Sequence, residues 1–174
     1  MNVKLKFSVP SAGREMPSIF CSTQGPTLTS VVVAFPIAFY VARIAGPRAK
    51  GILLVSVLLR PSTPMPIWPE LSLVAGEAVA RAVGAGAVVS HPNDVMIAGR
   101  KVAGVLPEAT RGRVVLGIGV NVNHTADELP RDTVKPTTSL RVALGREVDR
   151  AELLPAILLE LERCYDAWDA RYRR

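Results

Sequence analysis

The residues best suited to chemistry lie on one face of a strand that we expect over residues 113–123. Successive side chains of a strand point to opposite faces, so one face here is aliphatic and the other carries Gly117, Gly119, Asn121 and Asn123. Glycine weakens a strand unless something must come close to its backbone. A small ligand lying over Gly117 and Gly119 would explain this pattern, and so would tight packing of a second sheet or a helix. Both explanations stay open.

A cation is expected beside these glycines, because the preceding strand would pair with this one through a hairpin. Residues 110–112 read as a three-residue loop with a left-handed glycine. That register sets Lys101 opposite Asn121, and Ala103 opposite Gly119. A four-residue loop would slip the register by one residue and turn the ammonium toward the aliphatic face, where burial is costly. The pairing therefore predicts an ammonium next to an amide, above bare backbone.

Two amphipathic helices and one further strand would support this hairpin. The first helix, over residues 71–83, has apolar residues at helical spacing and an exposed pair, Glu77 and Arg81, four residues apart. Residues 51–60 are rich in leucine and valine, which predicts a strand buried on both faces. The second helix follows Asp149, a suitable cap. Its apolar stripe would comprise Leu154, Ile157, Leu158, Leu161, Tyr165, Trp168 and Tyr172.

Several short strings in this region occur in a fixed order at close spacing. They are Pro92-Asn93-Asp94, GRKVAGVL at 99–106, Glu108 and GIGVNVN at 117–123. Residues 51–61, residues 71–83 and Thr138-Ser139-Leu140 agree with them. Each string alone is weak, but together they are specific. The set resembles the catalytic domain of biotin–protein ligases, in the biotin/lipoate ligase superfamily, over residues 48–172.

The resemblance implies a fold and a domain organisation. The expected class is α+β, with a mixed or antiparallel sheet packed against helices as in the class II synthetase-like catalytic domain of this family. Residues 51–174 would form the catalytic core, and residues 1–50 a divergent N-terminal part. The small C-terminal β-barrel domain of the family is expected to be absent, as is the DNA-binding module that some members carry.

The resemblance also implies a reaction in two steps. The carboxylate of biotin attacks the α-phosphorus of ATP to give biotinyl-5'-AMP, and a lysine of a biotin carboxyl carrier protein, a subunit of acetyl-CoA carboxylase, then accepts the biotin. Both steps develop negative charge on phosphate or carboxyl oxygens, which a fixed ammonium stabilises in the transition state. Lys101 is therefore the expected catalytic residue.

The same resemblance assigns the ligand contacts. Biotin would lie against a cation and bare backbone, at Lys101, Gly104, Gly117 and Gly119. ATP would be held by amide and carboxylate groups, at Asn93, Asp94 and Asn121, although Asp94 could instead orient its loop. Mg²⁺ would accompany the triphosphate, since phosphates and carboxylates suit it. No metal site built from protein side chains is expected.

One segment departs from the family pattern. In the family, a strand like residues 31–34 leads into a basic loop, GRGRxGRxW, that closes over biotin and the adenylate phosphate. Here residues 35–46 are mostly apolar, and Arg43, Gly46 and Arg48 are the nearest equivalents. The lid has diverged, or this part is read in a shifted frame. Three functions therefore stay open: a biotin ligase of reduced activity, a weak or inactive binding module, and a lipoate–protein ligase.

Composition narrows the choice of partners. The 174 residues suffice for one domain, and the net charge of +6 suits a nucleotide or an acidic protein. Aromatic residues make up 5% and do not alternate with basic runs, so nucleic-acid binding has little support. The apolar run at residues 29–45 contains Pro36 and Arg43 and is shorter than the ~20 residues that span a bilayer.

The two cysteines, Cys21 and Cys164, have neither a CxxC nor a zinc-ligand spacing. A reduced, cytoplasmic location is therefore the expectation. A homodimer is one assembly that the sequence leaves open.

Overall fold

The computed structural model describes residues 19–23, 28–34, 38–45, 51–110 and 112–172, with side chains over 51–109 and 112–172. An eight-stranded sheet in the order β1-β2-β3-β4-β8-β7-β6-β5 forms one layer, and every neighbouring pair is antiparallel. The strands are β1 (Ile19–Thr23), β2 (Leu28–Ala34), β3 (Ala38–Ala45), β4 (Ile52–Leu59), β5 (Val88–Ser90), β6 (Asp94–Ile97), β7 (Arg100–Thr110) and β8 (Arg113–Asn121). The predicted α+β class is confirmed.

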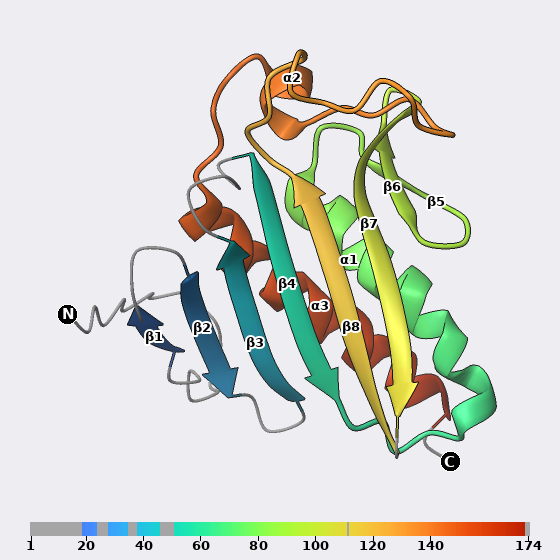
Figure 1. Ribbon diagram of the computed structural model, residues 1–174. Coiled ribbons are helices and arrows are strands. Elements are labelled where there is room, and N and C mark those ends of the chain that lie inside the picture. The colour runs from blue at the N-terminus through green and yellow to red at the C-terminus, as the bar shows by residue number, and fades with distance from the viewer. Residues whose placement is uncertain (1–18, 24–27, 35–37, 46–50, 111, 173–174) are drawn as a thin grey trace.

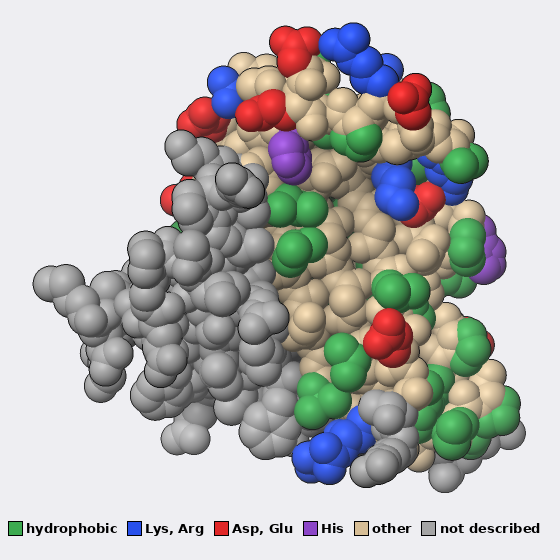
Figure 2. All heavy atoms as spheres, viewed as in Figure 1, with side chains coloured by type: hydrophobic (Ala, Val, Ile, Leu, Met, Phe, Trp, Pro, Cys, Tyr) green, Lys and Arg blue, Asp and Glu red, His purple; other side chains and the backbone are tan. Residues whose placement is uncertain are grey.

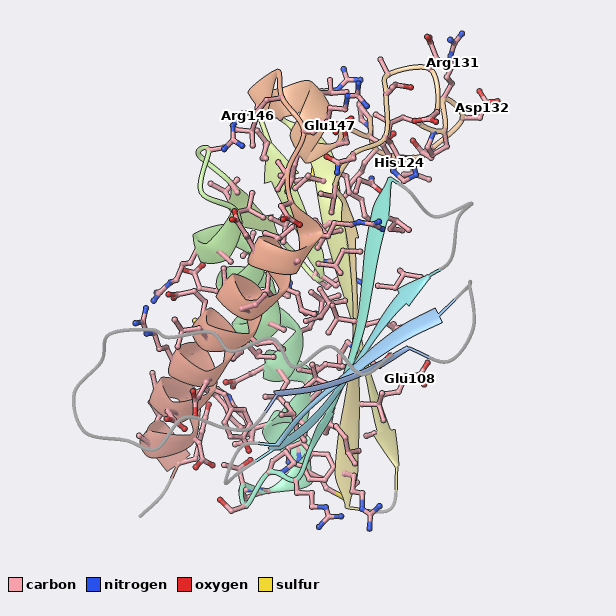
Figure 3. The ribbon with its side chains drawn as sticks, turned by 90° about the vertical axis from the view of Figure 1, so that its left-hand side faces the viewer. Glu108, His124, Arg131, Asp132, Arg146 and Glu147 are labelled. Atoms are coloured by element: carbon pink, nitrogen blue, oxygen red, sulfur yellow. The ribbon has the colours of Figure 1, made fainter. Side chains whose placement is uncertain are left out.

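Both long helices lie on one side of the sheet (Figures 1 and 3). A 3-10 helix, η2 (Met65–Glu70), leads into α1 (Leu71–Val83), while α2 (Leu140–Leu144) and α3 (Arg150–Tyr172) follow the last strand. No helix in the described part of the chain has the length and apolarity needed to cross a membrane. Residues 31–34, which resemble a strand of the family, lie within β2, and their burial falls outside what the structure describes.

The core is the layer between the sheet and the two long helices. The apolar stripe predicted for α3 is buried from Leu154 to Trp168, and Trp168 is only 1% exposed. The Trp168 indole Nε1–H donates to Glu70 Oε2 at 2.9 Å, which ties the end of α3 to the start of α1. On the outside of α1, Glu77 and Arg81 form the predicted ion pair at 2.9 Å.

The prediction that residues 51–60 are buried on both faces is wrong. Burial alternates along β4: Leu53 and Val57 are fully buried, whereas Leu54 is 39% exposed and Ser56 is also exposed. The reason is that the helices cover one face of the sheet and leave the other without a helical layer (Figure 3). The β4 strand therefore contributes side chains to both the core and the open face.

The predicted three-residue hairpin loop is also wrong. Thr110 pairs directly with Arg113, so the register is one residue away from the prediction. Ala103 lies opposite Val120, not Gly119. Taken by itself, this slip would invert every side chain that precedes it on β7 and turn Lys101 toward the core.

A β-bulge reverses the slip before it reaches Lys101. The pairing of β6 with β7 changes register after Val95. Val95 faces Ala103, and the next residue of β6, Met96, faces Lys101, so Val102 has no partner on β6. Val102 is the extra residue, and both Val102 and Ala103 are buried, at 0% and 2% exposure. Two consecutive core side chains of this kind mark a bulge, which re-aims the neighbouring residue on the strand. Lys101 therefore returns to the open, glycine-bearing face.

The sequence left open whether residues 35–46 are a divergent lid or are read in a shifted frame, and the structure describes residues 38–45 of this segment as a paired strand. These residues form β3, which pairs with β2 on one side and β4 on the other. Arg43, the one Lys or Arg in the sequence of residues 35–46, takes the register position opposite Leu54. Residues 35–37 and 46–50, with Gly46 and Arg48, lie outside the described residues.

This packing predicts unequal costs for two equal truncations. Leu161→Ala removes a side chain with 0% exposure from the helix–sheet layer and should lower the free energy of unfolding by about 2–5 kcal/mol. Leu144→Ala, at a leucine that is 36% exposed, is the matched control and should cost under about 1 kcal/mol. Urea denaturation followed by tryptophan fluorescence measures both, and equal costs would contradict the assignment of the core.

Candidate functional site

A hollow of about 500 Å³ lies on the open face of the sheet, over β4, β8 and β7. Figure 2 looks onto this face, where backbone surface is exposed between the side chains. Glycines form much of its floor, and Leu54 and Leu106 are apolar residues at its edge, 39% and 58% exposed. Its lining residues are Leu54, Val55, Ser56, Asn93, Lys101, Gly104, Val105, Leu106, Gly117, Ile118 and Gly119.

Of the floor glycines, Gly117 and Gly119 are not required by contacts with the described part of the protein. A Cβ on Gly117 would lie 3.5 Å from the Leu106 carbonyl oxygen, and one on Gly119 would lie 3.5 Å from Leu54 Cδ2. Both are ordinary van der Waals contacts. Of the two explanations that the sequence left open, tight internal packing therefore lacks support in the described contacts, whereas close approach of a ligand fits the hollow.

Lys101 and Asp94 form an ion pair at the edge of the hollow. The Lys101 Nζ lies 2.5 Å from Asp94 Oδ1 and 3.3 Å from the position that a Cβ of Gly104 would take. Asp94 is only 5% exposed. Its second oxygen, Oδ2, accepts a hydrogen bond from Lys135 Nζ at 2.7 Å. One buried carboxylate therefore carries two ammonium groups, and the cluster has one net positive charge.

The ionisation of Asp94 follows from these partners. Burial on its own raises the pKa of Asp94, but the ion pairs with Lys101 and Lys135 outweigh it, so the pKa is lowered from its usual value. Asp94 thus stays ionised at neutral pH and can hold the Lys101 ammonium in place. A fixed ammonium beside bare backbone can bind an anionic group and stabilise charge that develops on it.

The segment that carries Lys135 is attached to β7 at Lys101 itself. The Lys101 N–H donates to the Pro136 carbonyl at 2.7 Å, and the Thr138 N–H donates to the Lys101 carbonyl at 2.8 Å. Asn121 Nδ2 also donates to the Thr138 carbonyl, at 3.1 Å. The end of β8 and the start of β7 therefore hold this segment beside the site.

The Thr-Ser-Leu string caps a helix next to the same segment. Ser139 caps α2 by accepting from the Val142 N–H at 3.1 Å and donating from its hydroxyl to the His124 carbonyl at 2.6 Å. Figure 3 shows His124 at the base of the loop that carries Arg131 and Asp132. The His124 ring lies so close to Gly51 that a Cβ on residue 51 would overlap it.

The structure brings most of the predicted site residues together. Five line the hollow: Asn93, Lys101, Gly104, Gly117 and Gly119. Asp94 lies behind Lys101, while Asn121 does not line the hollow and holds the Thr138 carbonyl. Figure 3 shows Glu108 on the helix-free side of the sheet.

Lys135 was missed by the sequence analysis. Its ion pair with Asp94 spans 41 residues, and no periodicity links the two positions. The one available signal was its place three residues before the Thr-Ser-Leu string.

These residues do not form a cage for a metal ion. Both oxygens of Asp94 are taken by ammonium groups, and the described residues contain no cluster of three or more His, Cys, Asp or Glu side chains with metal-binding geometry. Cys164 is half buried in α3, and burial raises the pKa of its thiol. A protein-held Mg²⁺ does not fit the described donor set.

The sequence is similar to a protein-family model and to individual proteins of known function. Residues 47–124 match the sequence model of the biotin/lipoate A/B protein ligase family. The bifunctional ligase/repressor BirA of Bacillus spizizenii is 38% identical over 120 residues, 64% of this chain and 37% of that protein. The biotin–[acetyl-CoA-carboxylase] ligase of Mycobacterium tuberculosis is 36% identical over 131 residues, 71% of this chain and 47% of that protein. The chain thus spans less than half the length of these relatives.

Solved structures agree with this likeness. The crystal structure of biotin protein ligase from Aquifex aeolicus superposes with a TM-score of 0.63 at 29% identity, covering 72% of this chain and 57% of that one. The same Aquifex enzyme in complex with biotin and ATP superposes with a TM-score of 0.56, covering 69% of this chain and 52% of that one.

The space around two glycines predicts different effects on the free energy of unfolding when each is replaced by alanine. Gly119→Ala should leave the free energy of unfolding unchanged within about 1 kcal/mol, because its Cβ meets Leu54 only at 3.5 Å. Gly51→Ala should destabilise the protein by about 1–3 kcal/mol, because its Cβ overlaps the His124 ring. Urea denaturation compares them, and a strongly destabilised Gly119→Ala would show that packing requires this glycine.

The lowered pKa of Asp94 predicts a pH-dependent contribution to stability. Because the folded-state pKa lies below the unfolded one of about 3.9, the contribution is complete above that pH and is lost as pH falls through the folded pKa. Asp94→Asn should cost on the order of 2 kcal/mol at pH 7, and its difference from the unchanged protein should shrink as pH falls below about 4.

Chemical denaturation between pH 7 and pH 3 tests this dependence. Asp132→Asn, at an exposed carboxylate, is the control and should show little difference at any pH. A cost of Asp94→Asn that stays constant with pH would contradict the assigned ionisation.

Proposed function

We propose that the chain is a member of the biotin/lipoate A/B protein ligase family, whose model matches residues 47–124, and that it activates biotin with ATP and transfers it to a lysine of a carrier protein. The observation that carries the proposal is the Lys101 ammonium, fixed by Asp94 at the edge of a hollow whose floor is Gly104, Gly117 and Gly119. An acyl-phosphate group could bind there, against backbone that no side chain covers and beside an ammonium that pairs with its negative charge.

The hollow suits a ligand that is apolar at one end and anionic at the other. Leu54 and Leu106 would contact the apolar part of biotin, while its carboxylate would point toward Lys101. Asn93 also lines the hollow and offers an amide that both donates and accepts. Its carbonyl accepts the Val105 N–H at 2.8 Å, which fixes this residue against β7.

In the first step, a biotin carboxylate oxygen would bond to the α-phosphorus of ATP as the bond to pyrophosphate breaks. Negative charge grows on the phosphoryl oxygens, and the Lys101 ammonium would stabilise it more in the transition state than before. In the second step, a carrier lysine amine would bond to the acyl carbon, lose a proton and release AMP. Mg²⁺ would enter with the phosphates of ATP, because the described side chains do not form a site for it.

The choice of biotin and of its carrier comes from the relatives. Those that are 36–38% identical are named as a biotin–[acetyl-CoA-carboxylase] ligase and as a bifunctional ligase/repressor. A biotin carboxyl carrier protein is therefore the proposed acceptor. Lipoate is the competing acid, and parallel assays with the two acids distinguish them.

A second candidate, ligand binding without transfer, is favoured by one observation. The segment that corresponds to the family's basic loop is a paired strand, β3, over residues 38–45. If no other segment supplies cations to the phosphates, biotin would bind and the adenylate would form slowly. Binding of biotin without labelling of the carrier would favour this candidate.

The proposal predicts a large loss on removing the ammonium. Lys101→Met should lower the rate of biotin-dependent pyrophosphate release by about 10²–10³, the effect of removing one charge-stabilising donor. Arg113→Met, at an exposed cation at the far end of β8, is the control and should retain the rate. Biotin, MgATP and a carrier domain are the reagents, with streptavidin blotting for transfer. Equal rates for the Lys101→Met and unchanged proteins would overturn the assignment of Lys101.

A further inference from the structure

Lys135 has no role in the mechanism above, yet it makes the second ion pair of the buried Asp94. The two ammonium groups sit on different oxygens: Lys101 on Oδ1 at 2.5 Å and Lys135 on Oδ2 at 2.7 Å. The two lysine side chains are equally accessible, at 37% and 36% exposure, whereas that of Asp94 is 7% exposed. Either lysine alone would suffice to neutralise the carboxylate, so the second cation requires an explanation.

The two lysines differ in what else they face. Lys101 lines the hollow and lies over Gly104, whereas Lys135 is not among the lining residues. Only Lys101 can therefore turn its ammonium toward a ligand in the hollow without a change in the backbone. When it does so, its ion pair with Asp94 is stretched or lost, and a buried carboxylate without a cation is strongly unfavourable.

The backbone around Lys135 is fixed, so its ammonium can stay in place during such a movement. Pro136 and Thr138 form backbone hydrogen bonds with Lys101 on β7, at 2.7 and 2.8 Å. The Lys135 carbonyl accepts a hydrogen bond from the Thr133 hydroxyl at 2.7 Å. The contacts of Pro136 and Thr138 come from the strand that carries Lys101, so Lys135 keeps its position relative to both charges.

We propose that Lys135 is a positioning residue that keeps Asp94 paired while Lys101 turns its ammonium toward a phosphate-bearing ligand in the hollow. This inference rests on the proposed function for the identity of that ligand, ATP or the acyl-adenylate. Lys135 acts through Asp94, not by touching the ligand. It lowers the cost of releasing Lys101 and so increases the affinity for the anionic ligand and the rate of its reaction.

The first test needs no ligand. If either lysine can neutralise Asp94, then Lys101→Met and Lys135→Met each have a small effect on the unfolding equilibrium constant, and the double variant exceeds the product of the two by about tenfold. Arg131→Met on the same segment, where Arg131 is paired only loosely with Asp127 at 3.5 Å, is the control that removes a positive charge without touching Asp94. Effects that simply multiply would overturn the inference, whether or not the chain binds ATP.

The second test separates action through Asp94 from direct attraction of phosphates. Calorimetric titration with ATP should show Lys135→Met raising the Kd about tenfold, with Lys135→Arg and Arg131→Met close to the unchanged protein. Adenosine, which lacks phosphates, should bind the unchanged and Lys135→Met proteins equally. In an Asp94→Asn background, Lys135→Met should no longer change the ATP affinity.

A Lys135 effect that persists in the Asp94→Asn background would overturn the positioning role and assign Lys135 to direct phosphate contact. If the unchanged protein binds neither ATP nor biotin, the proposed function fails, and the stability cycle decides the role of Lys135 independently.

Discussion

A carboxylate that is almost removed from water must be matched by positive charge, and Asp94 imposes this requirement on the open face of the sheet. Transfer of an ionised group from water is strongly unfavourable unless it is paired and hydrogen-bonded. Asp94 is 5% exposed and holds ammonium groups from β7 and from the segment before α2. Asp94 therefore fixes where the Lys101 ammonium lies, and the chemistry of the hollow depends on that position.

The pairing in turn depends on strand register. Asp94 faces Gly104, Gly104 faces Gly119 and Gly119 faces Leu54, so these four residues form one row across β6, β7, β8 and β4. A row that runs from a charge over two glycines to an apolar side chain is already a binding surface with two different ends. The bulge at Val102 places Lys101 on the same face of the sheet as this row, because regular pairing would have placed it with Val122 in the core.

The sequence predicted the local features well and the register poorly. The helical stripe that ends at Trp168, the Glu77–Arg81 pair and the glycine face of β8 all follow from periodicity within one segment. The loop before Arg113 has no signature that separates two residues from three, and the bulge leaves no mark in composition. Lysine on the open face was predicted from the cost of burying it, although the predicted register was wrong.

Two features of the site could not be predicted from the sequence, because they depend on how distant segments and layers assemble. The Lys135–Asp94 pair joins segments 41 residues apart, and such contacts depend on the assembled sheet. The open face of β4 was missed because its leucines and valines predict burial on both faces, whereas burial depends on which layers exist. Leu54 is exposed since helices cover only the other face of the sheet.

Separation of the two faces explains how the sheet can tolerate a floor of glycines. Glycine lowers the stability of a strand, and β8 has two, at Gly117 and Gly119. Their neighbours Leu116, Ile118 and Val120 point to the helix side and are at most 2% exposed, so packing on that face holds the strand. The stability of β8 is therefore supplied on one face while ligand contact is left to the other. A change on the open face can alter binding without loss of the fold, as long as Asp94 keeps a cation.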